Sequence, residues 1–391
     1  MKKIGLYVEC KRAWGRQVAV GVAAFARTRG DWALEMVERG DIVSRGAAGF
    51  DGFIARITDS AVSDAMARAG VPVADIYGGA FRVAGGGRCG VFRAVRQDNT
   101  AVGQMAARHF IEHRFSRFAY CGYSGERFSD ERQNAFVRCL RLNHFDCSVY
   151  DAPRGASKRL KLSISNNDER IGVGVDSADI ARWLKTLEVP CAVFCANDVR
   201  AYHLRKACEA ASLSVPQDIA IMGVDNDSLV CNFMTPPLSS IDPDAFGLGF
   251  AAAEFLQRRL DGEAGGMPRQ IAPRELVVRE STQTFPVDPA WLSDALVFIR
   301  RNIGRHISAA DVYEHVKHSH SRVNLVFREK LGTSVQKEIR RVALSEAKRL
   351  LSTTRLTVAE ISKRVGFASQ QYFCNVFTDA FGQPPSTMRQ P

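Results

Sequence analysis

The sequence predicts an α/β region with parallel sheets, followed by an all-α C-terminal domain. Up to about residue 280, short apolar runs alternate with amphipathic helical stretches, which is typical of parallel sheets covered by helices on both faces. Beyond Trp291 only helical periodicity remains. The length of 391 residues exceeds what one hydrophobic core normally supports, so at least two domains are expected.

In the α/β region the expected strands are short, largely apolar runs. They lie at Ile4–Glu9, Gly52–Ala55, Val71–Ile76, Phe118–Cys121, Ala192–Cys195 and Ile219–Val224, with a last strand at Glu275–Arg279. The expected helices lie near Gly15–Thr28, 100–113, 129–143, 177–187, 198–212 and 244–261. Because ligands of such sheets bind beyond the carboxyl ends of the strands, side chains just after these runs are candidates for a binding site.

A polar, proline-containing stretch separates the two regions. Residues 281–289 read Ser-Thr-Gln-Thr-Phe-Pro-Val-Asp-Pro, which is typical of a linker. We therefore place an N-terminal domain at 1–282, a linker at 283–290 and a C-terminal domain at 291–391. The net charge is +11, and residues 286–391 contribute 16 Lys and Arg against 9 Asp and Glu. This local excess favours binding to a polyanion such as DNA.

The C-terminal domain contains an internal repeat with a period of about 50 residues. The matched pairs are Ser308 with Thr357, Asp311 with Glu360, Val316 with Val365, Phe327 with Phe377, and Gly332 with Gly382. Each copy opens with a capping-box spacing, in which a hydroxyl and a carboxylate three residues apart satisfy free amides at a helix start. The repeat predicts two helix-turn-helix motifs, at about 308–328 and 357–378.

The second copy has the residues that a tight turn between two helices needs. Gly366 can adopt the left-handed conformation of the turn, and Ser369 can cap the following helix. Phe373 and Phe377 lie four residues apart and anchor one face of that helix. Its outer face then presents Gln370, Gln371, Cys374 and Asn375. Amide side chains pair bidentately with adenine edges in the major groove, so this helix is the better candidate for reading bases.

The first copy departs from this pattern. Lys317 stands where the second copy has Gly366, the turn is one residue shorter, and bulky Tyr313 precedes it. Its docking on DNA is therefore expected to differ. Between the copies, Val335–Leu351 reads as a single helix of roughly 24 Å. The two recognition helices could then occupy successive major grooves on one face of the duplex.

The C-terminal residues resemble the AraC/XylS family of transcription regulators. The resemblance is carried by Ala347-Lys-Arg-Leu-Leu-Ser352, Ile361, Val365-Gly-Phe367, Tyr372-Phe373, Phe377 and Phe381-Gly-Gln-Pro-Pro385. On the first recognition helix it places His320, Ser321 and Asn324. On the second it places Gln370, Gln371 and Asn375. Basic side chains suited to phosphates, which position the protein without reading sequence, are Arg322, Arg328, Lys330 and Lys363.

The α/β region resembles the sugar-binding domain shared by LacI-type repressors and periplasmic binding proteins. The matching stretches are Asp98-Asn99, Phe194-Cys-Ala-Asn-Asp198, Ile221-Met-Gly-Val-Asp-Asn226, Leu238-Ser-Ser-Ile241, Leu256–Gly262 and Leu276-Val-Val-Arg-Glu-Ser-Thr282. This periplasmic-binding-protein-like (type I) fold has two lobes that close on a ligand. Its three chain crossings are expected near 98–113, 236–242 and 268–274. The fusion with an AraC-type module resembles regulators of the xylose-operon activator type, with a shared stretch at Arg12–Val18, and implies a xylose-like pentose as effector.

Sugars are bound by planar, bidentate polar groups together with an aromatic or apolar face. The resemblance points to five ligand-binding candidates, Trp14, Arg16, Arg132, Asn197 and Asp225. The first two follow the first strand, where they could stack on the sugar and hydrogen-bond it. Two alternatives stay open, since Asp225 could cap a turn and Arg132 could pair with Asp130 or Glu131.

We expect no metal, no cofactor and no enzymatic activity. The ten cysteines form no CxxC pair and no zinc-ligand pattern, and no Walker A, GxSxG or HExxH arrangement occurs. Gly85–Gly87 lacks the strand–helix context of a phosphate loop and is expected to be a surface turn. No apolar run reaches 18 residues, so a cytoplasmic protein without membrane contact is expected.

Together these patterns predict a sugar-responsive, sequence-specific DNA-binding transcription regulator, an activator of genes for xylose or related pentose catabolism. The expected partners are promoter or operator double-stranded DNA, a xylose-like pentose effector, RNA polymerase and a second copy of the chain in a homodimer. The alternative is a DNA-binding regulator, or repressor, whose N-terminal domain senses a different sugar or only dimerises.

Overall fold

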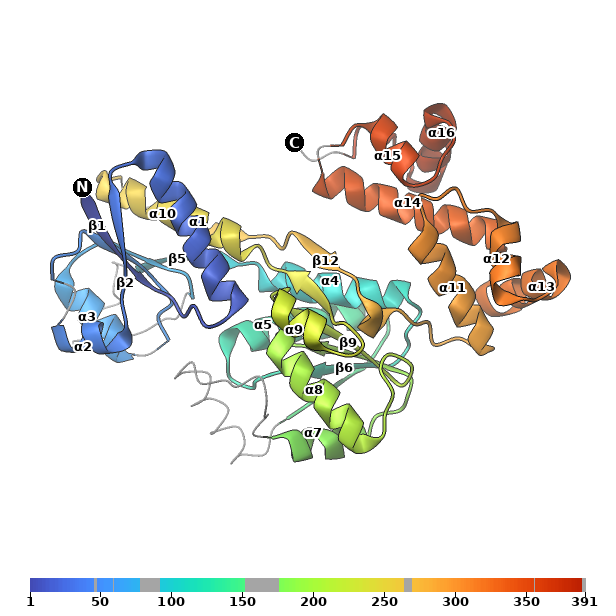
Figure 1. The fold of residues 1–391 in the computed structure, drawn as a ribbon, viewed down its shortest axis with the longest axis horizontal. Helices are drawn as coiled ribbons and strands as arrows, with labels where there is room; N and C mark the ends of the chain where they lie inside the picture. Colours follow the sequence, from blue (N-terminus) through green and yellow to red (C-terminus); the bar gives the residue numbers. More distant parts are fainter. Residues whose placement is uncertain are drawn as a thin grey trace. The chain divides into compact units, whose positions relative to one another are not determined.

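The computed structural model describes residues 1–45, 48–58, 60–77, 92–151, 176–263, 269–354 and 356–388 (Figure 1). The chain divides into two compact units. The first comprises Met1–Ile111 and Ser116–Thr282, and the second comprises Glu112–Phe115 and Gln283–Pro391. The glycine run Gly85–Gly87 lies outside the described residues. Each unit is described by itself.

The first unit contains two parallel sheets. The first sheet has the strand order β11 (Arg269–Ile271), β5 (Phe92–Gln97), β4 (Val73–Asp75), β3 (Gly52–Ala55), β1 (Lys2–Tyr7) and β2 (Trp32–Met36). Every strand pair in it is parallel. Side chains alternate between its faces, so that Ile54 joins one buried cluster and Phe53 another. The helices around this sheet are α1 (Ala13–Arg29), α2 (Arg39–Arg45), α3 (Ser60–Ala69) and α10 (Ala245–Leu260).

Helices α1 and α10 run side by side against the first sheet (Figure 1). Glycines on both helices permit a close approach of the two backbones. A Cβ on Gly21 would lie 2.1 Å from the carbonyl oxygen of Phe246, and one on Gly249 would lie 2.1 Å from that of Val18. Any side chain at either position would force the helices apart, which explains why glycine stands there.

The second sheet has the strand order β12 (Glu275–Val277), β10 (Ser239–Asp242), β9 (Ile219–Val224), β8 (Cys191–Cys195), β6 (Phe118–Cys121) and β7 (Cys147–Val149). All its pairs are parallel except β12, which runs antiparallel to β10. The associated helices are α4 (Asn99–Glu112), α5 (Arg127–Leu142), α7 (Ser177–Leu184), α8 (Asp198–Ala211) and α9 (Ser228–Phe233). Two lobes of parallel sheet and helix confirm the predicted α/β fold class.

The chain passes between the two sheets three times. It does so through α4 between β5 and β6, at 243–244 between β10 and α10, and at 272–274 between β11 and β12. The sequence-based positions were 98–113, 236–242 and 268–274. The second differs because β10, which the hydrophobic pattern did not reveal, occupies Ser239–Asp242 and moves the change of sheet just beyond it.

The second unit is helical. It consists of α11 (Ala290–Asn302), α12 (Ala309–Val316), α13 (His320–Leu331), α14 (Val335–Thr353), α15 (Val358–Arg364) and α16 (Gln370–Phe381). Both predicted capping boxes are present, at Ser308 with Asp311 and at Thr357 with Glu360. Helix α14 supplies buried side chains to one cluster under α11–α13 and to another under α15 and α16. It is the shared scaffold of two helix-turn-helix motifs.

The segment expected to be a linker packs as part of the second unit. Phe285 is 3% exposed and belongs to the buried cluster of α11–α14. The ring of His113 stacks on it at 4.9 Å between centroids. The apolar residue within the polar stretch 283–290 explains why this stretch does not extend freely into solvent. Among the helices that the structure describes, none is long and apolar enough to cross a membrane.

Candidate ligand pocket and DNA-binding surface

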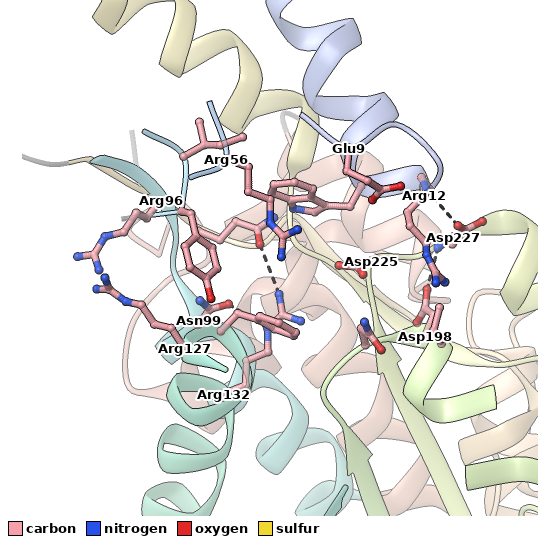
Figure 2. A pocket seen from close by; sticks show the side chains of 18 of the residues that line it. Glu9, Arg12, Arg56, Arg96, Asn99, Arg127, Arg132, Asp198, Asp225 and Asp227 are labelled. Carbon is pink, nitrogen blue, oxygen red and sulfur yellow. Dashed lines mark hydrogen bonds between the residues drawn. The ribbon is translucent and has the colours of Figure 1, made fainter. Parts of the chain in front are cut away.

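The first unit contains a cavity of about 130 Å³ beyond the carboxyl ends of its strands (Figure 2). Polar side chains dominate its lining, with Trp14, Ile76, Tyr77 and Phe128 as the larger apolar groups. The charged lining residues are Glu9, Arg12, Arg56, Arg96, Arg127, Glu131, Arg132, Asp198, Asp225 and Asp227. Both lobes contribute, as parallel-sheet topology leads one to expect. The cavity is small for a ligand pocket and suits a molecule of few heavy atoms.

Arg132, on α5, forms the floor of the pocket and is 2% exposed. Its Nε donates to Asn99 Oδ1 at 2.9 Å, its Nη1 to the carbonyl oxygen of Ala196 and its Nη2 to Gln97 Oε1 at 3.4 Å. Desolvation lowers the pKa of Arg132, which the negative charge of Asp225 partly offsets. These bonds, rather than the alternative pairing with its neighbours along α5, hold the guanidinium in place.

Two acidic groups and an amide follow strands β8 and β9 on the opposite side of the floor. Asn197 caps α8 by accepting a hydrogen bond from the amide of Arg200 at 2.8 Å. Asp225 has a φ of 107°, an uncommon conformation for a residue with a side chain. Burial raises the pKa of Asp198 well above its ordinary value, and the charge of Asp225 adds to this effect.

The two candidates after the first strand differ in their contacts. Trp14 is half-buried and lines the cavity. Arg16 is absent from the described lining, and its Nη1 donates instead to the carbonyl oxygens of Lys11 at 2.8 Å and Cys10 at 3.3 Å. The expectation that Arg16 binds the ligand is therefore corrected. These hydrogen bonds tie the Arg16 side chain to the backbone of the loop that precedes Trp14.

Sequence reasoning missed Arg56, which directly follows β3. Its guanidinium lies over the ring of Trp14 at 5.7 Å and over that of Tyr77 at 5.3 Å. The hydroxyl of Tyr77 donates to Glu126 at 3.3 Å. Burial and the charge of Glu126 raise the pKa of Tyr77 to about 12. The rule that binding residues follow parallel strands could have identified Arg56.

Helix α16 presents the expected amides to solvent. Gln370, Gln371 and Asn375 are exposed, whereas Phe373 and Phe377 are fully buried beneath them. Cys374 differs from the expectation, because it is half-buried and packs against the core cluster of α14–α16. It is therefore removed from the outer face. A residue missed there is Tyr372, 49% exposed, with the Arg340 guanidinium 6.0 Å from its ring.

Helix α13 carries the first set of candidates. His320, Ser321, Arg322 and Arg328 are exposed on it. Asn324 is half-buried, and its amide donates to the Tyr313 hydroxyl at 2.7 Å and to the carbonyl oxygen of His320 at 3.0 Å. The Tyr313 ring also lies 4.2 Å from that of His320. Tyr313, the bulky residue that distinguishes this copy, therefore already accepts a hydrogen bond from the Asn324 amide that was expected to contact a base.

The turn of the first motif is strained at Lys317, which has a φ of 55°, whereas glycine fills the second turn at Gly366 with a φ of 87°. We predict that Lys317→Gly stabilises the protein by about 0.5–1 kcal/mol, because glycine pays no steric penalty in this conformation. Urea unfolding of the full chain measures the change. The matched control, Arg328→Gly within α13, should destabilise by about 1 kcal/mol. Equal destabilisation by both substitutions would contradict the prediction.

Comparison with known proteins agrees with both units. A family model described as a periplasmic binding protein-like domain matches residues 107–282, and a helix-turn-helix domain model matches 313–391. The xylose operon regulatory protein of Haemophilus influenzae is 26% identical and that of Escherichia coli K12 is 28% identical. These alignments cover 99% of this chain and 98% and 96% of those proteins, respectively.

A solved structure aligns with both units together. The structure of the xylose-binding transcription activator xylR aligns with a TM-score of 0.59 at 27% identity, covering 99% of this chain and 97% of that one. A ribose-bound LacI-family regulator from Enterococcus faecium covers 73% of this chain, with a TM-score of 0.56 and 19% identity, and supports the fold alone. The chain is therefore a DNA-binding transcription regulator with a periplasmic-binding-protein-like ligand domain. Over nearly its whole length it is similar to the xylose operon regulatory proteins.

Proposed function

We propose that the pocket of the first unit binds a pentose of the xylose type and that the chain activates transcription in response. The observation that carries the proposal is that Arg132, Asn197 and Asp225 line one cavity together with the half-buried ring of Trp14. A guanidinium, an amide and a carboxylate bind hydroxyl groups directionally, and an aromatic face covers the C–H side of a sugar ring. The names of the full-length relatives support the same class of effector.

The pocket lining suggests how the effector acts. Trp14 and Arg56 come from the lobe of the first sheet, whereas Arg132 and Asp225 come from the lobe of the second. A ligand that bonds to both sets at once binds the closed lobes better than the open ones and shifts the population toward them. In a homodimer, closure would change the placement of the two DNA-binding units, engage both operator half-sites and recruit RNA polymerase.

The test is operator binding by the full chain with and without D-xylose. Fluorescence anisotropy should show tighter binding to operator DNA at saturating sugar, with little change for a scrambled duplex. Isothermal titration of the same preparation reports sugar binding directly. Equal operator affinity with every pentose and hexose tested, together with no heat of binding, would instead support an N-terminal domain that only dimerises.

Gln371 is predicted to read a base. Its exposed amide lies on α16, and replacing it with alanine should cost about 1–3 kcal/mol at one operator position and relax the preference there. The matched control is Lys363→Ala, an exposed residue on α15 expected to contact phosphate. That change should weaken all sequences alike and reduce the salt dependence. A uniform loss for Gln371→Ala would identify the glutamine as a backbone contact.

A further inference from the structure

Helix α4 connects the two units of the chain. Its residues 99–111 belong to the first unit, whereas its last residue, Glu112, and the three residues that follow it belong to the second. The chain returns to the first unit at Ser116. The segment Glu112–Phe115 is therefore a piece of the second unit that is attached directly to a helix of the first.

The first turn of α4 lies at the ligand pocket. Asn99 lines the cavity and accepts a hydrogen bond from Arg132 Nε at 2.9 Å. Asp98, just before the helix, lies where the chain passes from the first sheet to the second. Its amide donates to the carbonyl oxygen of Ile271 at 2.8 Å, and its carboxylate accepts from the amide of Ala101 at 2.9 Å. A change in the angle between the lobes, or in the position of Arg132, therefore acts directly on the start of α4.

The body of α4 is packed closely against its neighbours. A Cβ on Gly103 would lie 2.6 Å from the carbonyl oxygen of Arg132 and 2.9 Å from the backbone nitrogen of Phe136, so the backbones of α4 and α5 are nearly in contact. His109 Nε2 lies 3.2 Å from the hydroxyl oxygen of Thr282, the last residue of the first unit. The 14 residues of the helix extend over roughly 21 Å. Because the interior is close-packed, a shift at one end of such a helix is passed along it rather than absorbed.

Three contacts fix the end of α4 within the second unit. They join the carbonyl oxygen of Glu112 to Arg300 Nη2 at 3.1 Å, the ring of His113 to that of Phe285 at 4.9 Å between centroids, and Arg114 to Glu338 at 3.9 Å. Phe285 belongs to the buried cluster of α11–α14. Glu338 lies on α14, the helix that supports both helix-turn-helix motifs. A shift at the end of α4 therefore reaches the scaffold of both motifs.

We propose that α4 transmits occupancy of the ligand pocket to the DNA-binding unit, and that His113 and Arg114 are the side chains through which it does so. A ligand that binds the closed lobes better than the open ones changes the position of the start of α4, and the contacts at its end convert this change into a different state of the second unit. This role rests on the proposed function, because it assumes that a sugar in this pocket controls operator binding. It names in addition the helix and the two residues, both outside the described lining, on which the control depends.

The experiment compares the full wild-type chain with the double variant His113→Ala/Arg114→Ala. Isothermal titration measures the affinity for D-xylose, and fluorescence anisotropy measures operator affinity with and without saturating D-xylose. The variant should bind the sugar with wild-type affinity. Its operator binding should lose the sugar-dependent tightening, which for allosteric coupling is commonly about 5–150-fold. Because coupling is reciprocal, operator DNA should tighten D-xylose binding in the wild type but not in the variant.

The matched control is Arg117→Ala. Arg117 lies a few residues further along the chain and pairs with Glu188 at 2.8 Å within the first unit, so its removal should preserve the coupling. If the double variant keeps the full sugar-dependent tightening, α4 does not transmit the signal and the proposed function stands. If the wild type neither binds a sugar nor changes its operator affinity, the proposed function fails as well.

Hydrogen–deuterium exchange of the wild-type chain tests the same role without a substitution. Saturating D-xylose should change the protection of backbone amides at 109–116 and 283–300, although the described lining of the pocket contains none of these residues. Changes confined to the residues of the pocket would contradict transmission through α4. This measurement decides the question even where the double variant does not fold.

Discussion

Replacement of Arg132 by methionine is expected to weaken effector binding by about 100-fold or more. Methionine fills a similar volume but offers no donor, so the ligand loses the charge-assisted hydrogen bonds available from the pocket floor. Each such bond contributes about 1.5–3 kcal/mol, and about 2.7 kcal/mol corresponds to 100-fold. Isothermal titration of the full chain measures the loss, and operator binding should become insensitive to the effector at the same concentration.

The matched control for this prediction is Arg138→Met, further along the same helix α5. Arg138 is exposed on the same helix and should retain wild-type affinity after substitution. Operator affinity without effector should be unchanged in both variants, because the substituted side chains lie outside the DNA-binding unit. Retention of effector binding within threefold in Arg132→Met would show that the pocket is not the effector site.

The accuracy of the sequence reasoning differed among the pocket residues. Asn197 and Asp225 follow strongly apolar strands, β8 and β9, and so could be located at strand ends from the pattern alone. Arg56 also follows a strand directly, but its contact with Trp14 and Tyr77 joins segments far apart in sequence. No local pattern contains such a contact. Arg16 was misassigned for the same reason, since its hydrogen bonds depend on the path of a loop.

A hydrophobic pattern does not reveal strands whose buried positions carry polar side chains that hydrogen-bond within the protein. β10 reads Ser-Ser-Ile-Asp, yet its first three residues are buried. The Ser239 hydroxyl accepts from the amide of Arg279 at 2.8 Å, and that of Ser240 donates to Asp198 at 2.6 Å. β5 was missed because arginines interrupt its apolar positions. The apolar strands β3, β6 and β9 were predicted with their observed boundaries.

The helical unit was easier to predict because its signals are local. Capping boxes, the glycine of a tight turn and aromatic residues four apart all act within a few residues of the chain. The half-burial of Cys374 was not predictable in this way, since it depends on packing against other helices. The same holds for the burial of Glu338, a carboxylate on α14 to which the sequence analysis assigned no role.

Glu338 is 1% exposed and forms the centre of a cluster of charged side chains in the second unit. Its two carboxylate oxygens accept from Arg341, at 2.6 Å from Nη2 and 2.9 Å from Nε. Arg114 lies 3.9 Å away, and the charge of Arg300 also acts on it. Burial alone would raise the pKa of Glu338, but the hydrogen bonds and charge of Arg341, with the charges of Arg114 and Arg300, lower it below its ordinary value.

Glu338→Gln is expected to destabilise the second unit by about 2–3 kcal/mol. The change leaves Arg341 and its neighbouring arginines without the carboxylate that they share. Removing one partner of a buried ion pair is costly, because the remaining charge is left without compensation. Arg341 is 40% exposed on its side chain, which keeps the effect below that of a fully buried pair. Glu346 on the same helix makes the same bidentate contact with Arg349, at 2.8 Å for both bonds, but is 32% exposed on its side chain. Glu346→Gln should therefore cost less than about 1 kcal/mol.

The pH dependence of the unfolding free energy provides the sharper test of this cluster. Because the pKa of Glu338 is lowered on folding, its contribution is present above the unfolded value of about 4.3 and is lost as the pH falls through the folded value. The difference in urea midpoint between wild type and Glu338→Gln should therefore be nearly constant from pH 7 down to the unfolded pKa and shrink as the pH falls below it. A difference that stays constant as the pH is lowered well below the unfolded pKa would mean that the glutamine disturbs packing rather than removing a charge.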